Sequence, residues 1–170
     1  MVFDFFAGGA VFAFPAMAAL SIFLSLPLQG CREPQSFYPT LGNAINSGEV
    51  TRGWLPDFMP ATTHDIHIAY DPSSPMTWCA FQFSPDDSQR LRSHLDSPKA
   101  LSPRVRNIEG SGWQWWPDFL KGHLDLATIQ NRGFTAYVVT EQDRGPYTLE
   151  VLFVINWQTG YGYFYRTASG

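Results

Sequence analysis

The N-terminal part of the chain carries an uncharged segment long enough to cross a membrane. From Gly8 to Leu28, 21 residues contain no charged side chain. At about 1.5 Å per helical residue, such a run extends roughly 30 Å, the thickness of the hydrocarbon core of a bilayer. We therefore expect residues 1–30 to be a hydrophobic signal segment or a transmembrane anchor, and the folded part of the chain to follow it.

The end of this segment, Leu28-Gln29-Gly30-Cys31, resembles the lipobox of bacterial lipoprotein signal peptides. The resemblance covers about 31 residues. It implies that the Cys31 sulfur receives a diacylglycerol and becomes the new N-terminus after cleavage. It also implies a domain on the periplasmic side of a bacterial inner membrane, or at the outer membrane if the lipoprotein is sorted there. The first seven residues depart from the pattern, because a secretory signal normally begins with Lys or Arg and they contain neither.

The alternative interpretation is a transmembrane helix that is not cleaved. Gly9 and Ala13 lie four residues apart, which suits close contact with helices of other membrane subunits.

The signals for the side of the membrane on which the domain lies disagree. Arg32 and Arg52 follow the apolar run and no basic residue precedes it, which favours a cytoplasmic domain. We give the lipobox more weight, because two arginines are a small number.

The composition of the whole chain restricts its partners. The net charge of −4 and the pI of about 5.4 argue against nucleic acid. Aromatic residues make up 16% and charged residues only 15%. Such a surplus of aromatic side chains fills a core and membrane contacts, or forms an exposed surface for a protein or ligand. Membrane lipid and other membrane-protein subunits are the partners we expect.

Residues 31–53 are expected to be a linker or a docking strap. Their prolines and glycines break any long periodicity, and a flexible chain of this length reaches roughly 25 Å. A pure spacer would not need the apolar side chains of Phe37, Tyr38, Leu41 and Ile45. We therefore predict that the segment is ordered in an assembled complex and buries Phe37 and Tyr38 against another chain.

Residues 54–170 are expected to form one α+β domain with a mainly antiparallel sheet covered by one or two short helices. Alternation of apolar residues predicts a hairpin, and short connections predict a three-stranded meander after it. Ser84 and Pro85 predict a helix that ends near Asp96. A helical turn is expected from Pro117 to Gly122. The five predicted strands are Thr63–Tyr70, Met76–Phe83, Phe134–Glu141, Tyr147–Asn156 and Tyr161–Thr167.

No pattern in the sequence indicates catalysis. The hydrolase, zinc-protease, phosphate-loop and dinucleotide motifs are missing from it, so we predict a protein that is not an enzyme, with no cofactor and no metal. Asp65 and His67 lie two apart on a predicted strand and share a face. A hydrolase or metal enzyme centred on this pair is the weakest hypothesis. Cys79 is expected to be a buried, unreactive thiol.

Two functions remain for a chain of this kind. The first is a membrane-anchored accessory or structural subunit that docks on a larger bacterial membrane complex, such as a respiratory or photosynthetic assembly. The second is an extracytoplasmic lipoprotein that binds a small molecule or a glycan through an aromatic surface. For the second function, Trp113, Trp115 and Trp116 are the candidate stacking platform.

Overall fold

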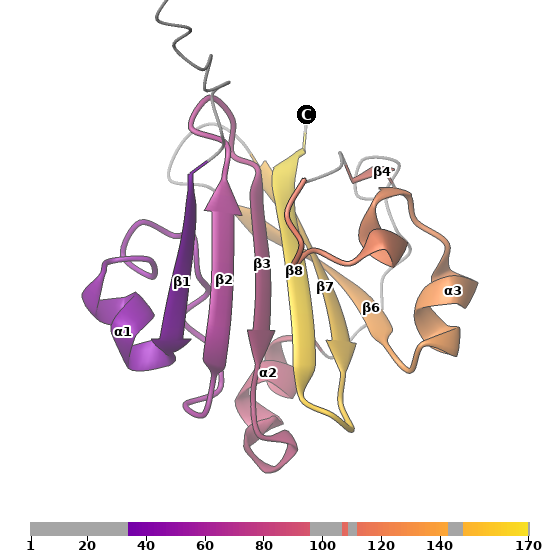
Figure 1. The fold of residues 1–170 in the computed structure, drawn as a ribbon, viewed down its shortest axis with the longest axis horizontal. Helices are drawn as coiled ribbons and strands as arrows, with labels where there is room; N and C mark the ends of the chain where they lie inside the picture. The colour runs from indigo at the N-terminus through magenta and orange to yellow at the C-terminus, as the bar shows by residue number, and fades with distance from the viewer. Residues whose placement is uncertain (1–33, 96–106, 109–111, 143–147, 170) are drawn as a thin grey trace, which may run out of the picture. The chain divides into compact units, whose positions relative to one another are not determined.

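A six-stranded antiparallel sheet organises the part of the chain that the structure describes (Figure 1). The structure is a computed structural model and describes residues 34–95, 107–108, 112–142 and 148–169. The spatial order of the strands is β1 (Gln35–Thr40), β2 (His64–Tyr70), β3 (Thr77–Gln82), β8 (Tyr161–Ser169), β7 (Thr148–Asn156) and β6 (Thr135–Gln142). A small second sheet joins β4 (Asn107–Ile108) to β5 (Gly122–His123).

The helices are all short. Three α-helices span Leu41–Asn46 (α1), Gln89–His94 (α2) and Leu126–Asn131 (α3). Two single turns of 3-10 helix, Pro85–Asp87 and Asp118–Leu120, complete the described elements. The predicted α+β class, with an antiparallel sheet and few short helices, is thereby confirmed.

Alternation along the strands gives the sheet two different faces. The first, which we call the phenylalanine face, carries the odd-numbered apolar residues of β7 together with Cys79, Phe81 and Phe164. The second, which we call the tryptophan face, carries Leu152 and Val154 of β7 together with Trp78 and Tyr165. Both faces of β7 are buried, as its continuous apolar run predicts.

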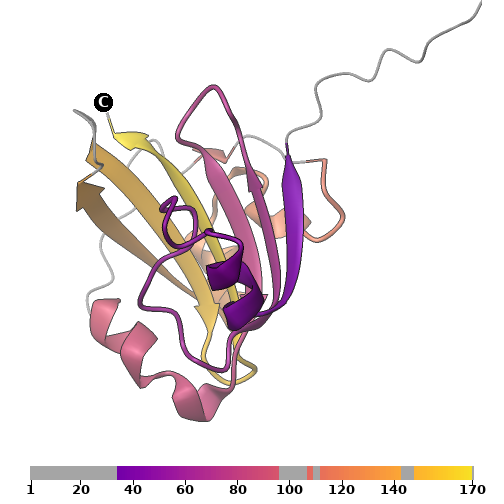
Figure 2. The same cartoon turned by 90° about the vertical axis from the view of Figure 1, so that its left-hand side faces the viewer.

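Different segments cover the two faces. The phenylalanine face buries Ala44 of α1, Leu91 of α2 and the segment that includes Leu55 and Met59. The tryptophan face buries Ile108, Ile129 of α3 and, from the segment between them, Trp113, Trp116, Leu120 and Leu124. Figure 2 shows α1 and α2 on one side of the sheet and the orange segment before α3 on the other.

The segment expected to be a linker belongs to the folded unit instead. Residues 35–40 form the edge strand β1, which is hydrogen-bonded to β2, and α1 follows at once. The expectation of a linker was wrong, because Pro39 and Gly42 were taken as breaks, while the alternative of a docking strap stays a prediction. An edge strand tolerates Pro39, since one side of its backbone needs no partner. The domain therefore begins before residue 54.

The predicted helix after Ser84 also differs in detail. Its first turn is the 3-10 turn at Pro85–Asp87, and α2 begins only at Gln89. The Ser84 hydroxyl makes no capping hydrogen bond. Instead the Asp87 carboxylate accepts hydrogen bonds from the backbone N–H and the hydroxyl of Thr62, which ties this turn to the sheet.

The apolar segment from Gly8 to Leu28 lies outside the described residues, as does Cys31. Among the helices that the structure describes, none combines the length and the hydropathy needed to span a bilayer.

Candidate functional site

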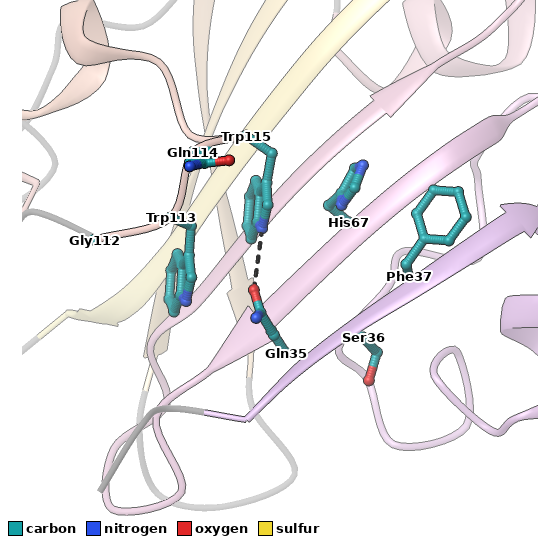
Figure 3. Close-up of a pocket in the computed structure, with 8 residues that line it drawn as sticks. All are labelled: Gln35, Ser36, Phe37, His67, Gly112, Trp113, Gln114 and Trp115. Carbon is teal, nitrogen blue, oxygen red and sulfur yellow. Dashed lines mark hydrogen bonds between the residues drawn. The ribbon is translucent and has the colours of Figure 1, made fainter. Parts of the chain in front are cut away.

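A groove of about 590 Å³ lies on the tryptophan face, at the β1 end of the sheet (Figure 3). This volume falls within the range of roughly 300–1,000 Å³ that is usual for ligand pockets. Three elements supply its wall. Gln35, Ser36 and Phe37 come from β1, His67 comes from β2, and Gly112, Trp113, Gln114 and Trp115 come from the segment that precedes the 3-10 turn at Asp118.

Strand pairing places the first part of the wall. In the antiparallel register Phe37 lies opposite His67, and Gln35 lies opposite Ala69. Residues directly opposite each other point to the same face, so the Phe37 and His67 rings meet with centroids 4.8 Å apart. Ser36 alternates with them, and its side chain points away from the other labelled residues in Figure 3. Ala80 lies opposite His67 on β3 and is small, which lets larger rings approach the strands.

The rings of the groove form a row. Trp115 is nearly parallel to His67, at 5.5 Å between centroids, and is parallel to Trp113 within 2° at 5.2 Å. Such spacings are typical of offset stacking. The Trp113 ring in turn meets the buried Trp78 ring edge-on at 5.2 Å. Figure 3 shows the Trp113, Trp115 and His67 rings side by side.

The row is anchored at one end and open at the other. Trp113 is buried, Trp115 and His67 are half-buried, and Phe37 is 52% exposed. The Trp115 Nε1–H donates a long hydrogen bond of 3.4 Å to the Gln35 side-chain oxygen. This bond joins two segments 80 residues apart in the sequence and holds the second wall of the groove over β1.

The described part of the groove wall carries no formal charge. None of the eight lining residues that the structure describes is Asp, Glu, Lys or Arg. Partial burial lowers the pKa of His67 below its ordinary value of 6.5, while the nearby Asp65 charge opposes part of that shift. Its imidazole is therefore neutral at pH 7, with one nitrogen that donates and one that accepts. Within the described residues neither nitrogen has a hydrogen-bond partner.

The structure separates the three candidate tryptophans. Trp113 and Trp115 line the groove, where their rings stack on each other. Trp116 does not, because it is 2% exposed and its Nε1–H donates to the Leu120 carbonyl at 3.2 Å. Its ring packs edge-on against Tyr163. Trp116 is therefore part of the core.

The structure also separates Phe37 from Tyr38. Tyr38 points to the phenylalanine face, where its hydroxyl donates to the buried Glu49 carboxylate. Burial, and next the bond to Glu49, raise the pKa of Tyr38. Arg52 also donates to Glu49, at 2.8 Å. Tyr38 is half-buried and bonded within its own chain, whereas Phe37 is exposed, and the burial of both against another chain stays a prediction.

Among the described residues, Asp65 and His67 interact electrostatically and share no hydrogen bond. A bulge interrupts the register between His64 and His67, and Asp65 has a positive φ of 48°. The Asp65 carboxylate lies 4.0 Å from His64 Nε2 and accepts a weak bond from Gln82. It is exposed and outside the groove wall. The described residues also contain no group of three or more His, Cys, Asp or Glu placed to hold a metal ion.

Sequence reasoning missed Gln35 and Gln114, the two amides of the groove wall. A single glutamine belongs to no functional motif. The one available signal was the two-residue spacing of Gln35 and Phe37, which puts both side chains on the same face of a strand. Cys79 is buried, as predicted, and burial raises the pKa of its thiol far above the usual range.

Comparison with known proteins gives one partial match. Residues 33–82, which are less than a third of the chain, match the family model of the YbbD head domain. The matched span contains β1, α1, β2 and β3, and with them Gln35, Phe37 and His67. The tryptophan wall of the groove lies outside it. Neither the comparison with curated proteins nor that with solved structures finds a match.

Proposed function

We propose that this chain is a non-catalytic binding protein, tethered at a bacterial membrane, that holds a small molecule or a glycan in the groove between Phe37 and Trp113. The observation that carries the proposal is the row of rings with polar edges and no fixed charge. A half-buried indole and an imidazole that has no hydrogen-bond partner among the described residues lie side by side in this groove of about 590 Å³, where a ligand can reach both.

Tryptophan fluorescence tests this proposal. A panel of metabolites and glycans is titrated into the full-length protein, and a ligand of the groove should change the emission of Trp115. The variant Trp115→Phe should reduce this response. The variant Trp54→Phe is the matched control, because Trp54 stacks on Tyr70 outside the groove. No response from any compound in the panel would contradict the proposed function.

The tether is the second part of the proposal. The lipobox-like Leu28-Gln29-Gly30-Cys31 supports a lipoprotein whose domain faces the periplasm. The mass of the intact native protein tests it. A chain that begins at a diacylated Cys31 is expected, whereas a mass that includes residues 1–30 would favour a retained membrane helix.

One observation favours the accessory-subunit alternative. Phe37 is a large apolar side chain, 52% exposed, on a strand at the edge of the sheet. A partner subunit could bury it. If the protein docks on a membrane complex, gentle detergent extraction should recover it together with defined partners, and Phe37→Ala should weaken that association. A monodisperse monomer without partners would count against this alternative.

A further inference from the structure

We infer that the groove binds an uncharged sugar chain, which lies across β1, β2 and residues 112–115 and is held by the polar edges of the rings and by the Gln35 and Gln114 amides. This inference rests on the proposed function and names the class of its ligand. Four properties of the groove support it: its charge, the spacing of its rings, the chemistry of their edges and its length.

The described part of the wall argues against strongly ionic ligands. Among its residues a phosphate or carboxylate would find no Lys or Arg, and a cation would find no Asp or Glu. The charge that acts on His67 is that of Asp65, which would repel an anion. Desolvating an ion without a partner of opposite charge is costly, so the occupant should be neutral.

The spacing of the rings excludes a flat aromatic ligand inserted between them. A flat ring between two others needs about 7 Å between their planes, because carbon atoms pack at roughly 3.5–4.0 Å. The centroids are only 5.5 Å apart between His67 and Trp115, and 5.2 Å apart between Trp115 and Trp113. A ligand therefore meets the edges of this row of rings.

The edges of these rings suit hydroxyl groups. Aromatic edges carry a partial positive charge and attract oxygen atoms. His67 adds one donor and one acceptor, and each glutamine amide adds both kinds of group. Hydroxyls also donate and accept, so a sugar can satisfy this mixed set. A peptide that follows the row would cross β1 and β2 and not run along them, so it would gain no backbone pairing with these strands inside the groove.

The length of the row favours several sugar units over one. Phe37, His67, Trp115 and Trp113 follow each other at 4.8, 5.5 and 5.2 Å. A single hexose ring cannot touch both ends of such a row. Phe37, at the exposed end, offers an apolar surface to the C–H groups of a terminal unit.

Calorimetric titration of the full-length protein tests the inference, in a detergent without a sugar headgroup. Cellohexaose, chitohexaose and maltohexaose are the neutral probes. A galacturonate hexamer, a neutral decapeptide and indole are the contrasting ones. At least one neutral hexasaccharide should bind at least tenfold more tightly than its monosaccharide. Trp115→Ala should weaken binding at least tenfold, while Trp54→Ala should not, provided that both variants retain the wild-type circular dichroism spectrum.

His67 provides a readout that a merely structural role would not change. Protonation removes its acceptor, so sugar binding should weaken as the pH falls from 7.5 to 5. His67→Gln keeps a donor and an acceptor that do not titrate, and should bind with little dependence on pH. A pH profile identical to that of the wild type would overturn the role of His67. His64 and Asp65 are the titratable neighbours on β2, and neither lines the groove.

The other outcomes separate the inference from the function on which it rests. If the acidic hexamer, the peptide or indole binds and the neutral sugars do not, with loss in Trp115→Ala, the sugar class is wrong and the proposed function stands. If none of the probes binds, both are overturned.

Discussion

The two faces of the sheet are built from the same strands but are covered to different extents. On the phenylalanine face, α1, α2 and the segment around Leu55 bury the strand residues from β2 to β7. On the tryptophan face, α3 and residues 113–124 bury β3, β8 and β7. There, Phe37 of β1 remains exposed and His67 of β2 only half-buried, and the two form a groove with Trp113 and Trp115.

The difference shows that alternation supplies apolar side chains to both faces but does not determine whether other segments cover them. Coverage depends on which connections pass over which strands. The segment over the tryptophan face meets β1 mainly through the bond from Trp115 to Gln35. A single long hydrogen bond contributes little to stability. The groove can therefore accept substitutions that the phenylalanine face cannot.

Truncating one phenylalanine on each face should give the largest contrast. Phe153→Ala removes a ring that is 0% exposed, and should lower the free energy of unfolding by about 3–5 kcal/mol. Phe37→Ala removes a ring that is 52% exposed, and should cost less than about 1 kcal/mol. Chemical denaturation measures both. Equal losses would show that the two faces do not differ as described.

The adjacent residues Trp115 and Trp116 allow the same comparison between groove and core. Trp116→Phe leaves a gap in the core and removes the donor to the Leu120 carbonyl, and should cost about 1–3 kcal/mol. Trp115→Phe should cost less than about 0.5 kcal/mol, because its ring is only half-buried and its hydrogen bond to Gln35 is long. The urea midpoints of the two variants provide the test, and a lower midpoint for Trp115→Phe would reverse the assignment of core and groove.

A variant of Tyr38 tests how the edge strand β1 is held on the phenylalanine face. Tyr38→Phe removes a donor from the buried Glu49 carboxylate, and hydrogen bonds to charged groups contribute about 1.5–3 kcal/mol. We expect a loss near the lower limit, since Arg52 still donates to Glu49. Tyr161→Phe is the control, because Tyr161 is 42% exposed and should not change the unfolding midpoint. A neutral Tyr38→Phe would mean that β1 is not held by this bond.

The smallest expected effect is the pH dependence that His67 gives to stability. Its folded pKa lies below the ordinary 6.5 because burial disfavours the charged ring. The unfolded chain then binds more protons, so stability falls as the pH drops from above 6.5 through the folded pKa. His67→Gln should remove this part of the acid loss, as seen in thermal midpoints between pH 7.5 and 5. An unchanged slope would mean that His67 is not desolvated.

Local patterns determined much of the fold. Alternation and turn residues were enough to predict the β2–β3 hairpin and the strands β6, β7 and β8, because antiparallel neighbours with short connections need little information from elsewhere. The three expected strands at the C-terminal end agree with β6, β7 and β8 to within two residues at each end. The helix α3 was not predicted. Asp125 accepts from the N–H groups of Ala127 and Thr128, but the helix is too short to show periodicity.

Elements that depend on distant partners could not be predicted. β1 contains Pro39 and becomes a strand only because β2 pairs with one of its edges. The pairing of β4 with β5 joins two-residue segments and leaves no pattern in the sequence. At Asp65 a positive φ of 48° and a bulge against β3 between His64 and His67 interrupt the regular strand, and neither leaves a pattern in the sequence.

The sequence by itself determined which side chains could form an aromatic site, since Trp113 and Trp115 are close together in a segment with no catalytic motif. Only the tertiary structure decided that they meet His67, Phe37 and Gln35. Strand pairing brings Phe37 beside His67, and the path of the chain over the sheet brings Trp115 beside both. Periodicity reports which way a side chain points within its own element. It does not report which distant element, 80 residues away, lies opposite.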